Sequence, residues 1–417
     1  MRRFLEIFGL ELRALVRSRS LAILLVAAVA WMLAMPYVVH GDGTVEGARE
    51  IYVRYSLGGV FVLLAVSLLA AATGTIARER SARRLQLTMV RPVRYFTIAL
   101  GKVAALSVVG AFVLAVAAGV LCVKVDVTRP CSHVLSPILP SPQEEAQEMY
   151  EVFMRDPETP AAVKKAKKSA VLRLLTQRAI DHYQTITTNA MVSWRFPLAA
   201  DGADTAQVRM RFSAQFDMRR DVCGRFTMDD LSVPVSNVTQ SVVLVPLGQL
   251  RPGLSGELSF RNEGDSALML RPRRDINLLL RADSFLWNLV RAYLELVALL
   301  TLIIAFGVAL SSALGRPVAL FVAIVTLVVS AISPSVLEQY PDPLDANAVD
   351  RIGLVMTRFA AQVTHPVSAL SPLEALSNDE CVEWTETART LLADVCLLPL
   401  LLALLAALVM PRKQEEA

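Results

Sequence analysis

The sequence predicts an α-helical polytopic membrane protein with six transmembrane helices and an inserted α+β domain outside the membrane. Hydrophobic residues make up 54% of its 417 residues and charged residues only 19%. The mean hydropathy is +0.48, which is too high for an ordinary soluble protein of this length. Six apolar stretches can serve as spans, and Lys and Arg gather on alternate connections between them.

The six predicted spans are apolar stretches in which a helix could satisfy its own backbone amides across about 30 Å of hydrocarbon. The fifth is the shortest. They cover residues 21–39, 57–77, 98–123, 296–314, 317–332 and 391–410.

The spans divide the chain into three predicted parts. Residues 1–123 contain an N-terminal interfacial helix, spans one to three and a cytoplasmic coupling segment at 78–97. Residues 124–285 lack a comparable apolar run and are numerous enough for a separate extracytoplasmic domain. Residues 286–417 contain spans four to six, an outer loop at 333–386 and a short cytoplasmic tail.

The positive charges predict the orientation of the spans. Fifteen Lys and Arg residues lie on the side that carries both termini, whereas the short connections of the other side carry four, Arg49, Arg54, Arg351 and Arg358. Because positive charge is retained in the cytoplasm, both termini are expected there. Four ionisable residues are expected at span ends, where they can reach the interface: Lys102, Arg291, Glu295 and Asp394. Arg291 and Glu295 could pair at helical spacing.

The first residues predict an amphipathic helix. Phe4, Phe8, Leu12 and Leu15 recur at helical spacing among Arg and Glu residues. We favour a helix that lies along the inner membrane surface, because its arginines would be costly in hydrocarbon. The alternative is that it lengthens the first span.

The coupling segment after the second predicted span is the most informative stretch of the sequence. It combines many arginines with the apolar residues Leu85, Leu87 and Met89, and Pro92 is expected to end its helix. A short helix of this kind, held between two spans, is suited to docking into a groove of a soluble partner. The candidate docking residues are Glu79, Arg80, Arg83, Arg84, Leu85, Leu87, Met89, Arg91 and Pro92.

This segment resembles the cytoplasmic loop of ABC-2 type transporter permeases, where a Glu-x-x-x-Gly-Thr-Leu-x-x-Leu-Leu-x-x-Pro stretch leads to a Gly-Lys pair. Glu79, Leu85, Pro92, Gly101 and Lys102 stand at matching positions. The sequence departs from the pattern at residues 83–84, which are arginines in place of Gly-Thr, and at residue 88, a threonine in place of leucine. The order of the elements along the chain is also similar to that family.

The resemblance implies a membrane permease subunit of an exporter in the bacterial inner membrane. It also implies a second permease subunit, identical or homologous, and a separate ABC ATPase subunit that uses ATP and Mg. The chain itself lacks a GxxxxGK[ST] phosphate loop, so we expect it to bind no cofactor. The alternative function is a non-transporting subunit that transmits ATPase motion to its extracytoplasmic domain and to envelope partners.

The extracytoplasmic domain is expected to begin with two helices, one from Pro142 and one over 161–183, followed by strands. Alternating patterns at 207–212, 241–245, 257–260 and 276–280 predict a small antiparallel sheet or sandwich, with a hairpin turn at 262–265. Cys131 and Cys223 could form a disulfide in an oxidising compartment, but the sequence does not fix the pairing. In the outer loop, 351–363 could form a helix.

Other classes of function are disfavoured. The basic residues sit in short clusters beside apolar stretches rather than along one face, which suits membrane orientation better than nucleic-acid binding. The cysteines and histidines show no metal-binding spacing, and no pattern of catalytic residues lies within a span. We therefore expect neither a metal site nor an enzymatic activity in this chain.

Overall fold

The computed structural model describes most of the chain and divides it into two compact units. One unit is built from the two terminal parts of the sequence and the other from Cys131–Ala282. The described residues are 2–39, 45–81, 94–139, 142–155, 168–197, 205–214, 221–228, 231–239, 242–248, 256–270, 275–339 and 371–415.

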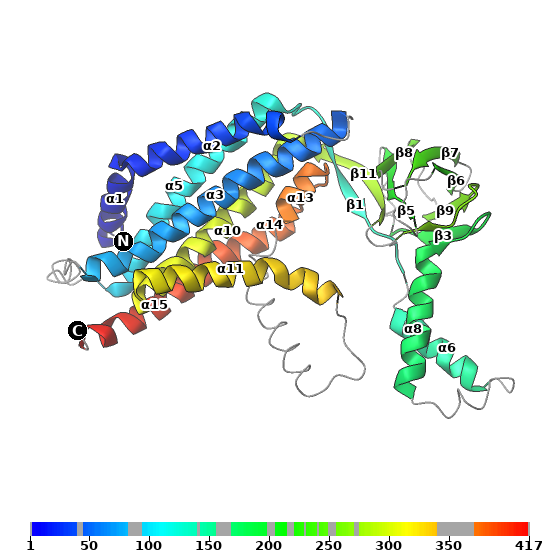
Figure 1. Cartoon of the computed structure of the whole chain (residues 1–417). Coiled ribbons are helices and arrows are strands. Elements are labelled where there is room, and N and C mark those ends of the chain that lie inside the picture. The colour runs from blue at the N-terminus through cyan, green and yellow to red at the C-terminus, as the bar shows by residue number, and fades with distance from the viewer. Residues whose placement is uncertain are drawn as a thin grey trace. The chain divides into compact units, whose positions relative to one another are not determined.

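The first unit is helical, and α10 lies at its centre, against α3, α5 and α15 (Figure 1). In its most apolar stretch, 72% of the residues of α10 are buried, compared with 17% in α2. The helices are α1 (Arg2–Arg17), α2 (Arg19–Val38), α3 (Val45–Ser81), α5 (Tyr95–Lys124), α10 (Phe285–Ala313), α11 (Arg316–Gln339), α13 (Ser371–Ser377), α14 (Trp384–Thr390), the π-helix η1 (Leu391–Leu397) and α15 (Leu398–Glu415).

Within the described residues, five helices are long and apolar enough to cross a membrane. They are α2, α3, α5, α10 and the continuous helix Trp384–Val409. The predicted fifth span falls in α11, whose apolar stretch Arg316–Val329 is shorter than the others. The membrane character of the chain is therefore supported, whereas the count of six spans stays a prediction.

The helices α3, α10 and Trp384–Val409 begin earlier than the hydropathy indicates. Contacts between helices bury the polar residues of their first turns. In α3, Arg49 pairs with Asp379, and its guanidinium lies 4.9 Å from the ring centroid of Phe285. In the helix from Trp384, the Thr387 hydroxyl donates to Glu295 at 2.7 Å. The sequence shows none of these partners.

The expected pairing of Arg291 with Glu295 was wrong. Arg291 donates instead to Asp283 and to the carbonyl oxygen of Val382, and its guanidinium lies over the ring of Trp384. Because α10 begins at Phe285 and α14 at Trp384, the residues Arg291, Glu295 and Asp394 are buried within helices that extend beyond the predicted spans. Their position near the span ends stays a prediction.

The first helix is separate from the second. A bend at Ser18, whose backbone is extended and whose hydroxyl donates to the carbonyl oxygen of Leu15, divides α1 from α2. The two helices lie at an angle to each other (Figure 1). The alternative in which the opening helix merely lengthens the first span was therefore wrong.

The second unit contains two four-stranded sheets around one apolar core. One has the order β1-β11-β4-β8 and the other β3-β9-β6-β7. Phe260 of β9 lies 5.0 Å from Phe212 and 4.8 Å from Phe226 between ring centroids. The strands are β1 (Pro130–Leu135), β2 (Thr185–Ile186), β3 (Met191–Arg195), β4 (Ala206–Arg211), β5 (Ser213–Ala214), β6 (Asp221–Met228), β7 (Leu231–Val238), β8 (Val242–Gly248), β9 (Glu257–Asn262), β10 (Leu268–Met269) and β11 (Ile276–Ser284).

The four predicted strands match β4, β8, β9 and β11. The predicted hairpin at 262–265 was wrong, because β9 pairs with β3 and β6, whereas β10 pairs with β2 and β5. Asn262 organises this crossing between sheets. Its buried amide nitrogen donates to the carbonyl oxygens of Ile186, Thr187 and Ser266, and its side-chain oxygen accepts from the amide of Gly264.

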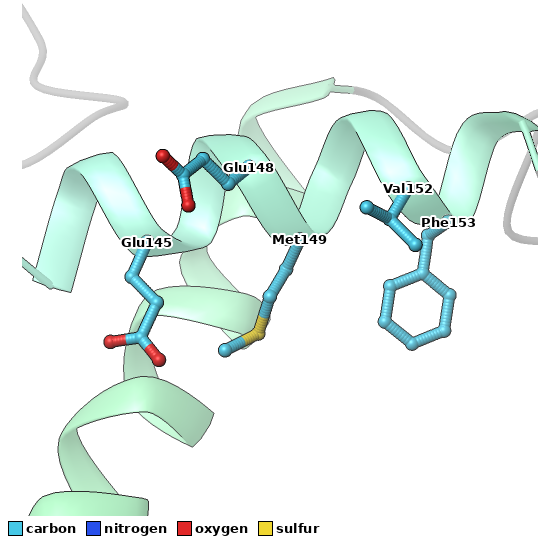
Figure 2. A pocket seen from close by; sticks show the side chains of 5 residues that line it. All are labelled: Glu145, Glu148, Met149, Val152 and Phe153. Atoms are coloured by element: carbon cyan, nitrogen blue, oxygen red, sulfur yellow. The ribbon is translucent and has the colours of Figure 1, made fainter.

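Two helices, α6 (Pro142–Arg155) and α8 (Lys168–Gln184), pack through the small core of Ala146, Val171 and Leu175. The start of α6 at Pro142 agrees with the prediction, and 161–167 of the predicted second helix lies outside the described residues. A hollow of about 310 Å³ on α6 is lined by Glu145, Glu148, Met149, Val152 and Phe153 (Figure 2). All five belong to one helix, so this hollow is an open surface.

The cysteines do not follow the pairing that the sequence left open. Cys131 and Cys381 are disulfide-bonded, whereas Cys122, Cys223 and Cys396 are free thiols. Cys223 is exposed on β6. It therefore does not pair with Cys131.

Candidate coupling site at the ends of α1, α3 and α5

A buried lysine joins the three helices that surround the coupling segment. Lys102 of α5 is only 2% exposed, and its ammonium group donates to Glu11 of α1 and, at 2.6 Å, to Glu79 of α3. An ammonium group removed from water needs such partners, because its desolvation costs several kcal/mol. We call Lys102, Glu11 and Glu79 the lysine junction.

The residue before this lysine explains how α1 approaches α5. A Cβ atom added to Gly101 would lie 2.9 Å from Cγ2 of Ile7 and 3.6 Å from the backbone nitrogen of Phe8. Because a larger side chain at this position would push α1 away, Gly101 permits the contact that brings Glu11 to Lys102. The Gly-Lys pair therefore has a physical role in this chain, since one residue provides space and the next provides charge.

The end of α3 is also held from a second direction. The backbone amide of Ala77 donates to the hydroxyl of Ser311 on α10 at 3.1 Å, and both residues are buried. The guanidinium of Arg316, at the start of α11, approaches α3 at Gly74, where an added Cβ would lie 3.2 Å from its Nε. Contacts from α5, α10 and α11 thus fix the last turns of α3.

The lysine junction lies close to both ends of the coupling segment. Glu79 is two residues before the end of α3, and Lys102 is seven residues after the start of α5. A displacement of the connection between these helices would therefore be carried directly into α3, α5 and α1.

The structure locates only part of the predicted docking set. Glu79 is described fully and points to Lys102, so it is a structural partner as well as a candidate contact. Arg80 belongs to α3 by its backbone. The remaining candidates lie outside the described residues: Arg83, Arg84, Leu85, Leu87, Met89, Arg91 and Pro92.

The sequence indicated Lys102 and Glu79 but not Glu11. Nothing in the pattern of the opening helix distinguishes Glu11 from Glu6, and its role follows only from the packing of α1 on α5. Within the described residues, no group of His, Cys, Asp and Glu side chains could hold a metal ion. Comparison of the chain with protein-family models, with curated proteins and with solved structures found no match.

Proposed function

We propose that this chain is the membrane permease subunit of an ATP-binding cassette exporter, driven by a separate ATPase that docks on residues 78–92. The observation that carries the proposal is the lysine junction. It ties the two helices that flank the coupling segment to each other and to α1. The resemblance of the segment to the loop of ABC-2 permeases supplies the class of the partner.

The proposed orientation places both termini in the cytoplasm of a bacterium and the second unit outside the inner membrane. The disulfide-bonded state of Cys131 and Cys381 supports it, since both residues belong to regions that the charge distribution assigns to the outside, and disulfides persist in oxidising compartments. The translocation path would lie between this chain and a second permease subunit.

The docking assignment is tested with the double variant Leu85→Asp, Met89→Asp. The variant should insert into the membrane normally but lose co-purification with an ATP-binding cassette ATPase encoded beside it, because carboxylates would replace the apolar contacts of the groove. The matched control is Leu174→Asp, an exposed leucine on α8 of the second unit. Co-purification equal to that of the wild type would refute the docking assignment.

A specific observation favours the alternative in which ATPase motion is transmitted to the outside without transport. The two chain connections that lead to the second unit are bonded to each other, because the amide of Phe285 donates to the carbonyl oxygen of Arg129 at 3.0 Å. In addition, β11 ends at Ser284 and α10 begins at the next residue.

Reconstituted inverted vesicles distinguish the two functions. Accumulation of a candidate substrate together with stimulated ATP hydrolysis supports transport. Stimulation by an envelope partner without accumulation of any substrate supports transmission.

A further inference from the structure

One carboxylate is buried deep inside the last apolar helix. Asp394 is the eleventh residue of the 26-residue stretch Trp384–Val409, which places it about 15 Å along the helix. The apolar run of this helix begins at Leu391, so Asp394 is its fourth residue and lies about 5 Å inside it. Ionisable groups within spans are rare and usually functional.

The backbone around Asp394 is irregular. It belongs to η1, a π-helix between α14 and α15. Pro399 follows within α15, where it supplies no amide hydrogen and its ring disfavours a regular preceding turn. The wider π-turn accommodates this interruption, and such turns inside α-helices occur frequently at functional sites.

The carboxyl group of Asp394 has no partner in the part of the chain that the structure describes. The residue is 1% exposed, and both carboxylate oxygens are buried without a hydrogen bond. An ionised carboxylate in this position would lose its hydration and gain nothing in return, a cost of several kcal/mol. The neutral acid avoids most of that cost.

The charged groups on the elements packed against η1 do not compensate Asp394. On α10, Arg291 is bound to Asp283 and Val382, and Glu295 accepts from Thr387. On α14, Glu386 and Arg389 are exposed. On α15, the sequence has no ionisable residue before Arg412.

A pocket lies beside a nearby part of the same helix. A pocket of about 260 Å³ beside the start of α14 is lined by Glu295, Glu374, Glu380 and Glu386, together with residues 375 and 381–382. Thr387, which donates to Glu295, precedes Asp394 by seven residues, or about 10 Å along the helix. Protons therefore have a carboxyl-lined approach to within two turns of Asp394.

We propose that Asp394 is a proton-binding site within the last span. In the conformation described here its carboxyl carries a proton, and a rearrangement that opens η1 toward water releases that proton and leaves the carboxylate. Only the O–H bond forms and breaks, and water supplies and accepts the proton. The proposal requires that the helix span the membrane, but it does not require an ATPase partner.

Infrared spectroscopy of the full-length protein in lipid nanodiscs tests the proposal without ATP or substrate. The carbonyl-stretch band of a protonated carboxylic acid should be present at neutral pH and disappear as the pH is raised. The difference spectrum between the wild type and Asp394→Asn should contain this band. The matched control Glu383→Gln, at an exposed carboxylate before α14, should leave it unchanged.

Thermal unfolding provides a second measurement. Because the folded protein holds the proton more tightly than the unfolded chain, stability should fall as the pH rises above about 4, where an aspartate of the unfolded chain loses its proton, until the folded protein also releases it, and Asp394→Asn should abolish this part of the pH dependence. An ionised Asp394 at neutral pH would overturn the proposal. So would a carboxylate band that changes when sodium is replaced by choline, because that result would indicate a metal cation as the ligand. The wild-type titration needs no variant, so a poorly folding Asp394→Asn does not prevent the test.

Discussion

Replacing Lys102 with Met tests the lysine junction most directly. The substitution keeps a long side chain, so it creates little empty space, but it removes the charge between Glu11 and Glu79. Both carboxylates contact the same ammonium group, one of them at 2.6 Å, so their contacting oxygens lie no more than about 5 Å apart. At an effective dielectric constant of about 20, two like charges at that distance repel by about 3 kcal/mol.

Solvent reduces this penalty. The side chains of Glu11 and Glu79 are 26% and 30% exposed, so either carboxylate can turn toward water. We therefore expect Lys102→Met to lower the free energy of unfolding by about 1–3 kcal/mol. The measurement is thermal or denaturant unfolding of the protein in detergent, together with ATPase co-purification, which should fall because the ends of α3 and α5 are no longer held together.

Three further variants separate charge from other effects. Lys124→Met removes an exposed lysine at the other end of α5 and should change neither stability nor co-purification. Lys102→Arg should retain much of the stability. The triple variant Lys102→Met, Glu11→Gln, Glu79→Gln should recover stability relative to Lys102→Met, because it removes the repulsion. The reasoning is refuted if Lys102→Met is as stable as Lys124→Met.

Two other predictions concern the approach of α1 and the topology. Gly101→Leu should displace α1 and increase tryptic cleavage after Arg13 and Arg17. Gly119→Leu on the same helix, where an added Cβ meets nothing within 4 Å, should not. Equal cleavage in both variants would contradict the close packing of α1 on α5. In cells whose outer membrane alone is permeabilised, a membrane-impermeant maleimide should label Cys223 without reductant, and Cys131 and Cys381 only after reduction. Protection of Cys223 until the inner membrane is broken would contradict the proposed orientation.

The sequence predicted those parts of the fold that depend on local patterns. The apolar centres of α2, α3, α5 and α10 were located by hydropathy, and β4 and β11 by alternation, because burial on one face imposes a period of two on a strand. The start of α6 at Pro142 was also predicted, since proline at the first helical position loses no hydrogen bond.

The sequence could not predict features that depend on distant partners. The early start of α3 requires Asp379, which is 330 residues from Arg49. The crossing at Asn262 requires carbonyl groups about 75 residues away. Glu11 meets Lys102 across 91 residues. In each case a polar residue looked like a solvated end or turn, and only the packing of remote segments shows that it is paired.

Helix α3 is long enough to connect the two ends of the first unit. Its 37 residues correspond to about 55 Å, more than the 40–45 Å of a bilayer with its headgroups. Near its last residues Glu79 pairs with Lys102, and near its first residues Arg49 pairs with Asp379. A rigid helix displaced at one end must therefore move its contacts at the other.

The segment after α13 would receive that displacement. Asp379 accepts a hydrogen bond from Arg49 of α3. The side chain of Asn288 on α10 donates to the carbonyl oxygen of Glu380 and accepts from the amide of Val382. A movement of α3 relative to α10 must strain the few residues between these anchors, which lead directly into α14 and η1. If an ATPase docks on the coupling segment as proposed, a force applied there would thus reach the helix that carries Asp394, and proton release there would be a step of the same cycle.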